Sequence, residues 1–409
     1  MERVTIERLG HQGDGIAPGP IYVPATLPGE VVLGDVEGGV MPTPRIETPS
    51  SDRVRPPCRH AKSCGGCQLQ HASDGFLADW KVGVVRQSLK AQGLEADFRP
   101  IQTSPAQTRR RATFSVRRTK KGALAGFHMK ASDVIVAVPD CQLVHPEIAA
   151  ALPMVEALAV LGASRKGALS VLLTRSLDGL DVAVTGGKPL DTALYAGLAD
   201  TARQYDLARI SWDGEPAITR RAPHLRMSGA LVTPPPGAFL QATPEGEAAL
   251  RSAVHEAVSG AGRMADLFAG CGTFALPLAQ GARVHAVEGD GAMLEALAQG
   301  HRTATGLKPV TTETRDLFRN PLLASELSGL DAVVIDPPRA GAEAQVAQLG
   351  QSGVPRIAHV SCNPVTFARD CATLVAAGYR LDWVQVVDQF RWSTHVEVAA
   401  QLTLGTPTK

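Results

Sequence analysis

The sequence predicts an α/β fold for residues 226–409, with helices covering a parallel sheet. Two observations support this prediction. Short apolar runs alternate here with helical segments, which is typical of repeated β-α units. The runs at 263–267, 283–287, 332–335 and 356–360 have the length of strands. Because ligands of such sheets bind beyond the carboxyl ends of the strands, the residues that follow these runs are the first candidates for a functional site.

Composition limits what else the chain can be. A length of 409 residues predicts two or three domains, and 44% hydrophobic with 20% charged residues argues against a mainly disordered chain. Because 41 Lys and Arg residues balance 40 Asp and Glu residues, total charge predicts no polyanionic partner, and such a partner would need a local basic patch. The chain has no apolar run of about 20 residues and no signal-peptide core, so we expect a cytoplasmic protein without a membrane partner. We also expect a monomer.

The two preceding parts differ from the α/β part in pattern. Residues 1–55 alternate short apolar runs with Gly and Pro, which favours a small β unit. Residues 56–225 begin with cysteines and mix a helix, expected at 76–92, with strands expected at 112–116 and 169–173. The sequence therefore predicts a β unit, a mixed α+β part and a parallel-sheet part, in that order.

Three signals near the ends of the predicted strands suit a nucleotide-like cofactor. Gly270 and Gly272 follow the first strand and allow a tight turn before a helix, although Gly-x-Gly alone also occurs in plain turns. Glu288 ends the second strand, where a carboxylate can accept hydrogen bonds from two ribose hydroxyls. Asp316 follows the next strand expected, where it can receive an adenine amino group or cap a helix.

The later strands are followed by candidate reactive groups. Asp336 and Arg339 flank two prolines that hold the backbone extended, which presents both side chains rigidly unless the segment is a plain turn. Cys362 follows the run at 356–360. A lone cysteine is more often buried and inert, but a thiol at the carboxyl end of such a sheet is placed to act as a nucleophile.

Glu397 lies inside an apolar, strand-like run near the end of the chain. A charge facing inward there costs stability unless it is paired or used, so Glu397 is a candidate general base with a raised pKa. His395 is interpreted as a structural hydrogen-bonding residue.

A cysteine cluster opens the middle part. Cys58, Cys64 and Cys67 lie within ten residues and include a Gly-Gly turn, which is a strong metal signal, and Cys141 is the candidate fourth ligand. The spacing leaves zinc and an iron-sulfur cluster both open. Cys271 and Cys371 are interpreted as structural, and we expect reduced thiols rather than disulfides.

A basic run between residues 109 and 121 is the local patch that total charge does not supply. It holds seven Lys and Arg residues, includes Phe114 and has no acidic residue. Such a run is often only a solvated face, but strand-like alternation with an aromatic residue favours phosphate contacts and base stacking in RNA binding.

Taken together, these motifs resemble the RNA uracil-5-methyltransferase family over nearly the whole chain. The matching segments, in family order, are Phe239-Leu240-Gln241, Asp266 to Thr273, Glu288, Asp336-Pro337-Pro338-Arg339, Ser361-Cys362-Asn363-Pro364 and His395-Val396-Glu397. The resemblance implies a Rossmann-like class I methyltransferase domain at 226–409, a TRAM-like OB-type β-barrel at 1–55 and a central iron-sulfur and RNA-binding domain at 56–225. It also implies that residues near 77–105 pack with the catalytic domain.

The resemblance further implies S-adenosylmethionine as the cofactor. Its contacts would be Gln241, Phe268, Thr273, Glu288, Asp316 and Asp336. Relatives often carry Asn in place of Thr273. In the implied chemistry, the Cys362 thiolate adds to uracil C6, C5 takes the methyl group, and Glu397 removes the C5 proton. Arg339 would orient Glu397 or the base, and the target uridine must be flipped out or lie in a loop.

The cysteine cluster bears on the substrate. The ribosomal-RNA branch of the family carries a 4Fe-4S cluster on cysteines that match Cys58, Cys64, Cys67 and Cys141, so the resemblance favours 23S ribosomal RNA. Transfer RNA is the alternative substrate. Cytosine-5 methylation fits less well, because those RNA enzymes commonly use two active-site cysteines. A non-catalytic iron-sulfur protein that binds RNA or senses redox state is the alternative from another class.

Overall fold

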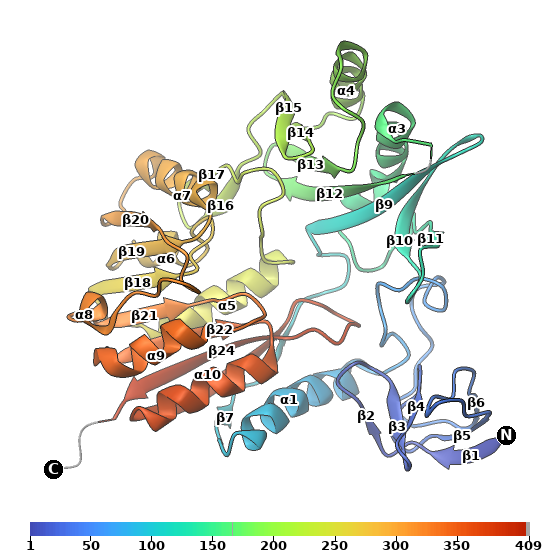
Figure 1. Ribbon diagram of the computed structural model, residues 1–409, viewed down its shortest axis with the longest axis horizontal. Helices are drawn as coiled ribbons and strands as arrows, with labels where there is room; N and C mark the ends of the chain where they lie inside the picture. The colour runs from blue at the N-terminus through green and yellow to red at the C-terminus, as the bar shows by residue number, and fades with distance from the viewer. Residues whose placement is uncertain (166, 406–409) are drawn as a thin grey trace.

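The structure, a computed structural model, describes residues 1–165 and 167–405. Its C-terminal part is a nine-stranded sheet (Figure 1). The strands are β7 (Asp97–Phe98), β8 (Gln102–Thr103), β18 (Arg263–Leu267), β19 (Arg283–Glu288), β20 (Val310–Thr314), β21 (Ala332–Ile335), β22 (Arg356–Ser361), β23 (Tyr379–Asp388) and β24 (Glu397–Leu404). Each strand predicted for this part is present, with bounds that differ by at most one residue.

The strand order places a switch point in the middle of the sheet. The order is β20-β19-β18-β21-β22-β24-β23-β7, and β8 also pairs with β23. The first five of these strands are parallel, and β24 is antiparallel to both of its neighbours. The chain leaves β18 toward β19 on one side and returns to β21 on the other, so a crevice is expected at the carboxyl ends of β18 and β21.

Helices cover both faces of this sheet (Figure 1). They are α1 (Asp74–Ala91), α5 (Pro244–Ala257), α6 (Ala275–Leu278), α7 (Gly291–Thr303), α8 (Ala324–Leu327), α9 (Glu343–Ser352) and α10 (Pro364–Ala376). One buried core joins the sheet to α5, α6 and α7, and a second joins its other face to α1, α8, α9 and α10. The short hairpin of β16 (Leu225–Met227) and β17 (Ala230–Val232) packs in the first core.

The helix α1 belongs to this part in space, although the middle part of the chain separates it in sequence. Val85 and Leu89 of α1 are buried with residues of α10, and β7 and β8 extend the sheet beside β23. The helix was expected at 76–92 and occurs within two residues of that range. Residues 74–103 therefore lie against the C-terminal sheet.

The middle part forms a seven-stranded sheet of order β11-β10-β9-β12-β13-β14-β15. The elements are β9 (Arg111–Thr119), β10 (Gly122–His128), β11 (Ile135–Val136), β12 (Ala168–Ser176), β13 (Gly179–Thr185), β14 (Arg209–Trp212), β15 (Glu215–Thr219), α2 (Pro146–Ala150), α3 (Leu152–Gly162) and α4 (Thr192–Gln204). The three helices share one core with the sheet. The strands expected at 112–116 and 169–173 lie within β9 and β12.

Residues 2–48 contain two three-stranded sheets, seen in blue in Figure 1. One consists of β1 (Glu2–Thr5), β5 (Val31–Gly34) and β6 (Arg45–Thr48), and the other of β2 (Arg8–Leu9), β3 (Gly15–Ala17) and β4 (Ile21–Val23). Val23 of one sheet and Val32 of the other are buried in a common core. A small β unit is therefore present, and the TRAM-like barrel stays a prediction. Among the described residues, no helix combines the length and the apolar character needed to span a bilayer.

Candidate active site

Two connected cavities lie at the carboxyl edge of the C-terminal sheet. The first, called the cofactor cavity, has a volume of about 640 Å³ and is lined largely by residues that follow β18, β19, β20 and β21. The second, called the cysteine cavity, has a volume of about 510 Å³ and lies between this edge, the middle sheet and residues 58–70. Both cavities are lined by Phe239, Arg339, Cys362 and Glu397. The two predicted reactive residues therefore lie where the cavities meet.

All six residues expected to contact a cofactor line the cofactor cavity. They are Gln241, Phe268, Thr273, Glu288, Asp316 and Asp336. The turn after β18 approaches this cavity because Gly270 and Gly272 adopt positive φ angles of 54° and 94°. A Cβ atom on Gly272 would lie 2.9 Å from Leu297 Cγ of α7, so the close approach of this turn to α7 also requires glycine.

Main-chain hydrogen bonds fix the two outer carboxylates of the cavity. Glu288 accepts hydrogen bonds from the N–H groups of Gly270 (3.0 Å) and Gly289 (2.7 Å). Asp316 accepts from the N–H groups of Phe318 (3.0 Å) and Arg319 (3.3 Å). Asp316 therefore caps a turn and lines the cavity at the same time, so the two interpretations of this residue are compatible.

The inner carboxylates make this cavity favourable for positive charge. Burial and the charge of Glu288 raise the pKa of Asp336 to about 7. Burial, followed by the charge of Asp336, raises the pKa of Asp266 well above its usual value. Because like charges held close together resist ionisation, a positively charged ligand beside them would be stabilised.

The reactive pair is aligned by one strand ladder. β22 pairs antiparallel with β24, and Ser361 lies opposite Val398. Cys362 comes directly after Ser361 and Glu397 directly before Val398, so both reactive residues lie at the same end of the ladder. Burial, followed by the charges of Glu397 and Asp336, raises the pKa of Cys362 to about 11. Burial and the charge of Asp336 raise the pKa of Glu397 to about 8. The free site therefore holds a protonated thiol beside a carboxyl that titrates near neutral pH.

Arg339 has the opposite effect on both reactive groups. Its positive charge lowers the pKa values of Cys362 and Glu397, against the larger effect of burial. Arg339 follows Pro337 and Pro338 after β21 and lines both cavities. This position agrees with the prediction from the sequence that the two prolines present Arg339 to the site.

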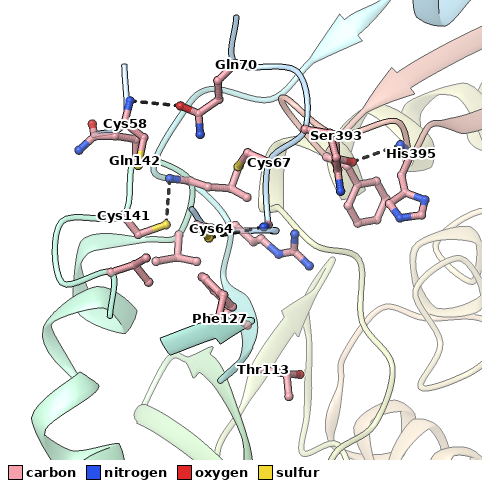
Figure 2. A pocket seen from close by; sticks show the side chains of 18 of the residues that line it. Cys58, Cys64, Cys67, Gln70, Thr113, Phe127, Cys141, Gln142, Ser393 and His395 are labelled. Carbon is pink, nitrogen blue, oxygen red and sulfur yellow. Dashed lines mark hydrogen bonds between the residues drawn. The ribbon is translucent and has the colours of Figure 1, made fainter. Parts of the chain in front are cut away.

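The four cysteines of the predicted metal site line the cysteine cavity together, opposite Ser393 and His395 (Figure 2). Main-chain N–H groups point at two of the sulfur atoms: Gly66 N–H lies 3.4 Å from Cys64 Sγ, and Leu143 N–H lies 3.5 Å from Cys141 Sγ. Burial and the charges of the neighbouring thiols raise the pKa of Cys67 to about 12. Within residues 1–165 and 167–405, however, no three His, Cys, Asp or Glu side chains are close enough together to hold a metal ion.

Two surface contacts of Asp140 hold Cys141 against the loop that carries the other three cysteines. Asp140 Oδ1 lies 2.8 Å from His60 Nε2, and Asp140 Oδ2 lies 2.9 Å from Arg59 Nε. These contacts join two segments that are about 80 residues apart in sequence.

The basic run divides into an inner and an outer part. Arg110 pairs with Glu247 of α5 and donates to the Gln241 carbonyl at 3.1 Å, and Arg111 donates to the Gly237 carbonyl at 3.2 Å. These arginines therefore fasten the middle sheet to the C-terminal part. Arg109 lines the cysteine cavity.

The expectation that Phe114 stacks on an RNA base is wrong. Phe114 is fully buried and stacks on Phe127, with ring centroids 4.8 Å apart. The aromatic ring completes the core of the middle sheet because β9 turns that face inward. The exposed cations of the run are Arg117, Lys120 and Lys121, on the hairpin of β9 and β10.

Two functional candidates were not predicted from the sequence. Lys81 of α1 is fully buried, and its Nζ lies 2.6 Å from Asp388 Oδ1 and 3.0 Å from the His395 carbonyl oxygen. It therefore anchors the loop that leads into Glu397. The sequence could have indicated Lys81 from its position on the buried face of a helix, because a charge there requires a partner. Gln389, the second candidate, lies in the same loop.

Comparisons with known proteins identify relatives of this chain. Residues 303–404 match the tRNA (Uracil-5-)-methyltransferase family. An uncharacterized RNA methyltransferase of Rhizobium meliloti is 44% identical over 98% of each chain. The 23S rRNA (uracil(1939)-C(5))-methyltransferase RlmD of Halomonas elongata is 34% identical over 96% of this chain and 88% of that one.

A solved structure extends the comparison to the fold. The Pyrococcus abyssi tRNA (uracil-54, C5)-methyltransferase, crystallised with S-adenosyl-L-homocysteine, superposes with a TM-score of 0.75. The match covers 98% of this chain and 99% of that chain at 24% identity. The two chains therefore share a fold along nearly their whole length.

Proposed function

The chain belongs to the RNA (uracil-5-)-methyltransferase family of S-adenosylmethionine-dependent enzymes with a class I methyltransferase fold, and we propose that it methylates C5 of a uridine in 23S ribosomal RNA. The observation that supports this reaction most strongly is that Cys362 and Glu397 lie at the junction of the cofactor and cysteine cavities. A flipped uracil could reach a nucleophile, a base and a methyl donor there at the same time.

The cofactor cavity fits S-adenosylmethionine. The cofactor supplies an electrophilic methyl group on a positively charged sulfur, and the carboxylates around Asp336 suit such a charge. We assign Glu288 to the ribose hydroxyls and Asp316 to the adenine amino group, because each lines the cavity with its carboxylate fixed by the main chain. Gln241, Phe268 and Thr273 complete the proposed contacts.

The proposed chemistry uses the reactive pair in sequence. Cys362 adds as a thiolate to uracil C6, which makes C5 nucleophilic enough to accept the methyl group. Glu397 then removes the C5 proton, and the electrons of the C5–H bond expel the thiolate from C6. Arg339 favours the ionised forms of both side chains, so it supports both steps.

We propose that Cys58, Cys64, Cys67 and Cys141 hold a 4Fe-4S cluster. In the described residues no three of these side chains are close enough together to hold a single metal ion. The support for a cluster is that four thiols line one cavity and that main-chain N–H groups point at two of the sulfurs, as they do around iron-sulfur clusters. Burial disfavours the thiolate forms of Cys64 and Cys67, and a bound cation would reverse this preference. Chemical analysis of iron and sulfide in anaerobically purified protein tests the assignment, and zinc without iron would overturn it.

The 23S target is favoured over transfer RNA by two observations. The relative named as a 23S rRNA methyltransferase is 34% identical over 96% of this chain, whereas the solved tRNA enzyme is 24% identical. The resemblance noted from the sequence also relates the four cysteines to those of the ribosomal-RNA branch. We further propose that residues 1–55 form a TRAM-like barrel, that 56–225 form an RNA-binding domain and that 226–409 form the catalytic domain.

Transfer of labelled methyl groups to unmodified 23S and transfer RNA transcripts tests this function. We expect label as 5-methyluridine in 23S RNA, with one or more positions identified by mapping. Label only in transfer RNA would keep the reaction and overturn the substrate. Label in neither RNA, from protein that binds the cofactor and retains its metal, would overturn both substrates.

A further inference from the structure

Gln389 occupies a buried position between the cofactor contact and the candidate base. Its side chain is 1% exposed, and it follows β23 directly. Gln389 Nε2 donates to Gln241 Oε1 at 2.5 Å. The amide of Gln389 also lowers the pKa of the Glu397 carboxyl. One amide group is therefore bound to the cofactor contact and acts on the candidate base.

The residues that lead into α5 hold this amide in a single orientation. Gln389 Oε1 accepts hydrogen bonds from the N–H groups of Ala242 (2.7 Å) and Thr243 (3.4 Å). Because the oxygen is bound to the main chain, the NH₂ group must face the other way, toward Gln241 and Glu397. A Cβ atom on Gly246 would lie 2.6 Å from Gln389 Cβ, so the helix leaves space for this side chain only because residue 246 is glycine.

The strand register brings Gln389 and Glu397 to the same face. Glu397 pairs with Val387 across β23 and β24, and Gln389 lies two residues beyond Val387. Side chains two residues apart in extended backbone point to the same side. The end of the ladder therefore places the start of this loop, with Gln389, on the side that carries Glu397.

We propose that Gln389 is a positioning residue that directs the Glu397 carboxylate toward the C5 proton and is itself held by Gln241 and the start of α5. The inference rests on the proposed function, in which Glu397 accepts that proton while the C5–H electrons form the C5–C6 double bond and the C6–sulfur bond breaks. A hydrogen bond to one carboxylate oxygen favours the ionised form and leaves the other oxygen to accept the proton. The other charged or titratable groups that affect Glu397 or lie beside it are Asp336, Arg339 and Cys362.

Release of tritium from C5 of the target uridine measures this step directly. RNA labelled at C5 is mixed with the holoenzyme and cofactor under single-turnover conditions, and both the covalent adduct and the released tritium are followed over time. The variant Gln389→Met removes both functions of the amide at similar length. Gln389→Glu keeps an acceptor for Ala242 N–H but removes the donors. The matched control is Gln385→Met, because Gln385 is a buried glutamine of β23 whose amide donates to the Pro100 carbonyl, away from the site.

The expected result separates proton removal from the other steps. Gln389→Met and Gln389→Glu should release tritium about ten to a hundred times more slowly than wild type, which corresponds to the loss of a hydrogen bond to a charged group. The pH midpoint for release should move upward in both, while the adduct forms at the wild-type rate. Gln385→Met should release tritium at the wild-type rate with an unchanged midpoint. Unchanged release in Gln389→Met, or equal slowing in Gln385→Met, would overturn the inference.

A Glu397→Gln enzyme in the same assay distinguishes the inference from the function on which it rests. If this variant forms adduct and retains tritium while Gln389→Met behaves like wild type, only the positioning role fails. If Glu397→Gln releases tritium normally, Glu397 is not the base, and the positioning role fails with it.

Discussion

The cofactor cavity and the cysteine cavity meet at Cys362 and Glu397 but are built in different ways. The cofactor cavity takes most of its lining from residues that follow neighbouring parallel strands of one sheet. The cysteine cavity is assembled from residues 58–70, the start of the middle sheet, the segment around Cys141 and the loop before β24. The lining of the cofactor cavity comes from one edge of one sheet, whereas the lining of the cysteine cavity depends on contacts between distant parts of the chain.

The largest effect is expected at the junction that the cavities share. Cys362→Ala should lower methyl transfer by about 10⁴-fold or more, because the covalent route through C6 is lost. Binding of the cofactor, measured by calorimetry, should stay at the wild-type level, since Cys362 is only one of many residues that line the cofactor cavity. The control is Cys371→Ala, which changes a buried cysteine of α10 and should retain activity. Methylation by Cys362→Ala would contradict the assignment.

The second effect is a loss of stability, and it tests whether the cysteine cavity depends on contacts between segments that are distant in sequence. Lys81→Met leaves Asp388 without its buried partner, which should lower the free energy of unfolding by about 3–5 kcal/mol. Denaturant titration measures this. Lys90→Met, at an exposed position of the same helix, should change the value by less than about 0.5 kcal/mol. Equal changes in the free energy of unfolding of the two variants would show that the contact of Lys81 with Asp388 does not stabilise the lining of the cysteine cavity.

The third effect is the pH dependence of proton removal by Glu397, which lies where the two cavities meet. Glu397 must be ionised to remove a proton, and burial together with Asp336 raises its pKa to about 8. The rate of C5 tritium release should therefore rise about tenfold per pH unit well below that value, or about 50-fold between pH 6 and 8, and then level off. A single-turnover pH profile checks this, and a flat profile over the same range would contradict the raised pKa.

The smallest effect is expected outside both cavities. Replacing Arg117, Lys120 and Lys121 together with Ala should weaken RNA binding about tenfold at low salt and should also reduce its salt dependence. Filter binding at several salt concentrations measures both changes. Arg302→Ala, at an exposed site on α7, serves as the control. If the triple variant binds like the control, the hairpin of β9 and β10 does not contact RNA.

The same contrast explains what the sequence could predict. Four strands of the C-terminal sheet, and Glu288, Asp316 and Asp336 of the cofactor cavity, follow from short apolar runs and the residues after them, because parallel strands share one edge. The other three residues of this cavity were predicted from the family resemblance. Lys81 shows the limit of such reasoning. Its place on the buried face of α1 predicts a buried partner, but its partner is 307 residues away in sequence. Phe114 shows the same limit, because alternation in β9 does not tell which face is buried.

Gln389 was missed for a related reason. A glutamine after a strand has no pattern of its own, and its role depends on three segments that meet only in the fold: residues 241–243, Gly246 of α5 and the start of β24. The four cysteines were predicted as a group because their spacing is unusual, yet the type of metal depends on geometry that spacing does not specify.

Trapping of the covalent intermediate tests the central claim most directly. The Glu397→Gln enzyme is incubated with unmodified 23S RNA and S-adenosylmethionine, denatured, digested and examined by mass spectrometry. We predict that the peptide containing Cys362 carries a 5-methylated uridine nucleotide and that the Cys362→Ser, Glu397→Gln double variant carries none. Absence of an adduct in Glu397→Gln, or an adduct on another cysteine, would contradict the assignment of these two residues.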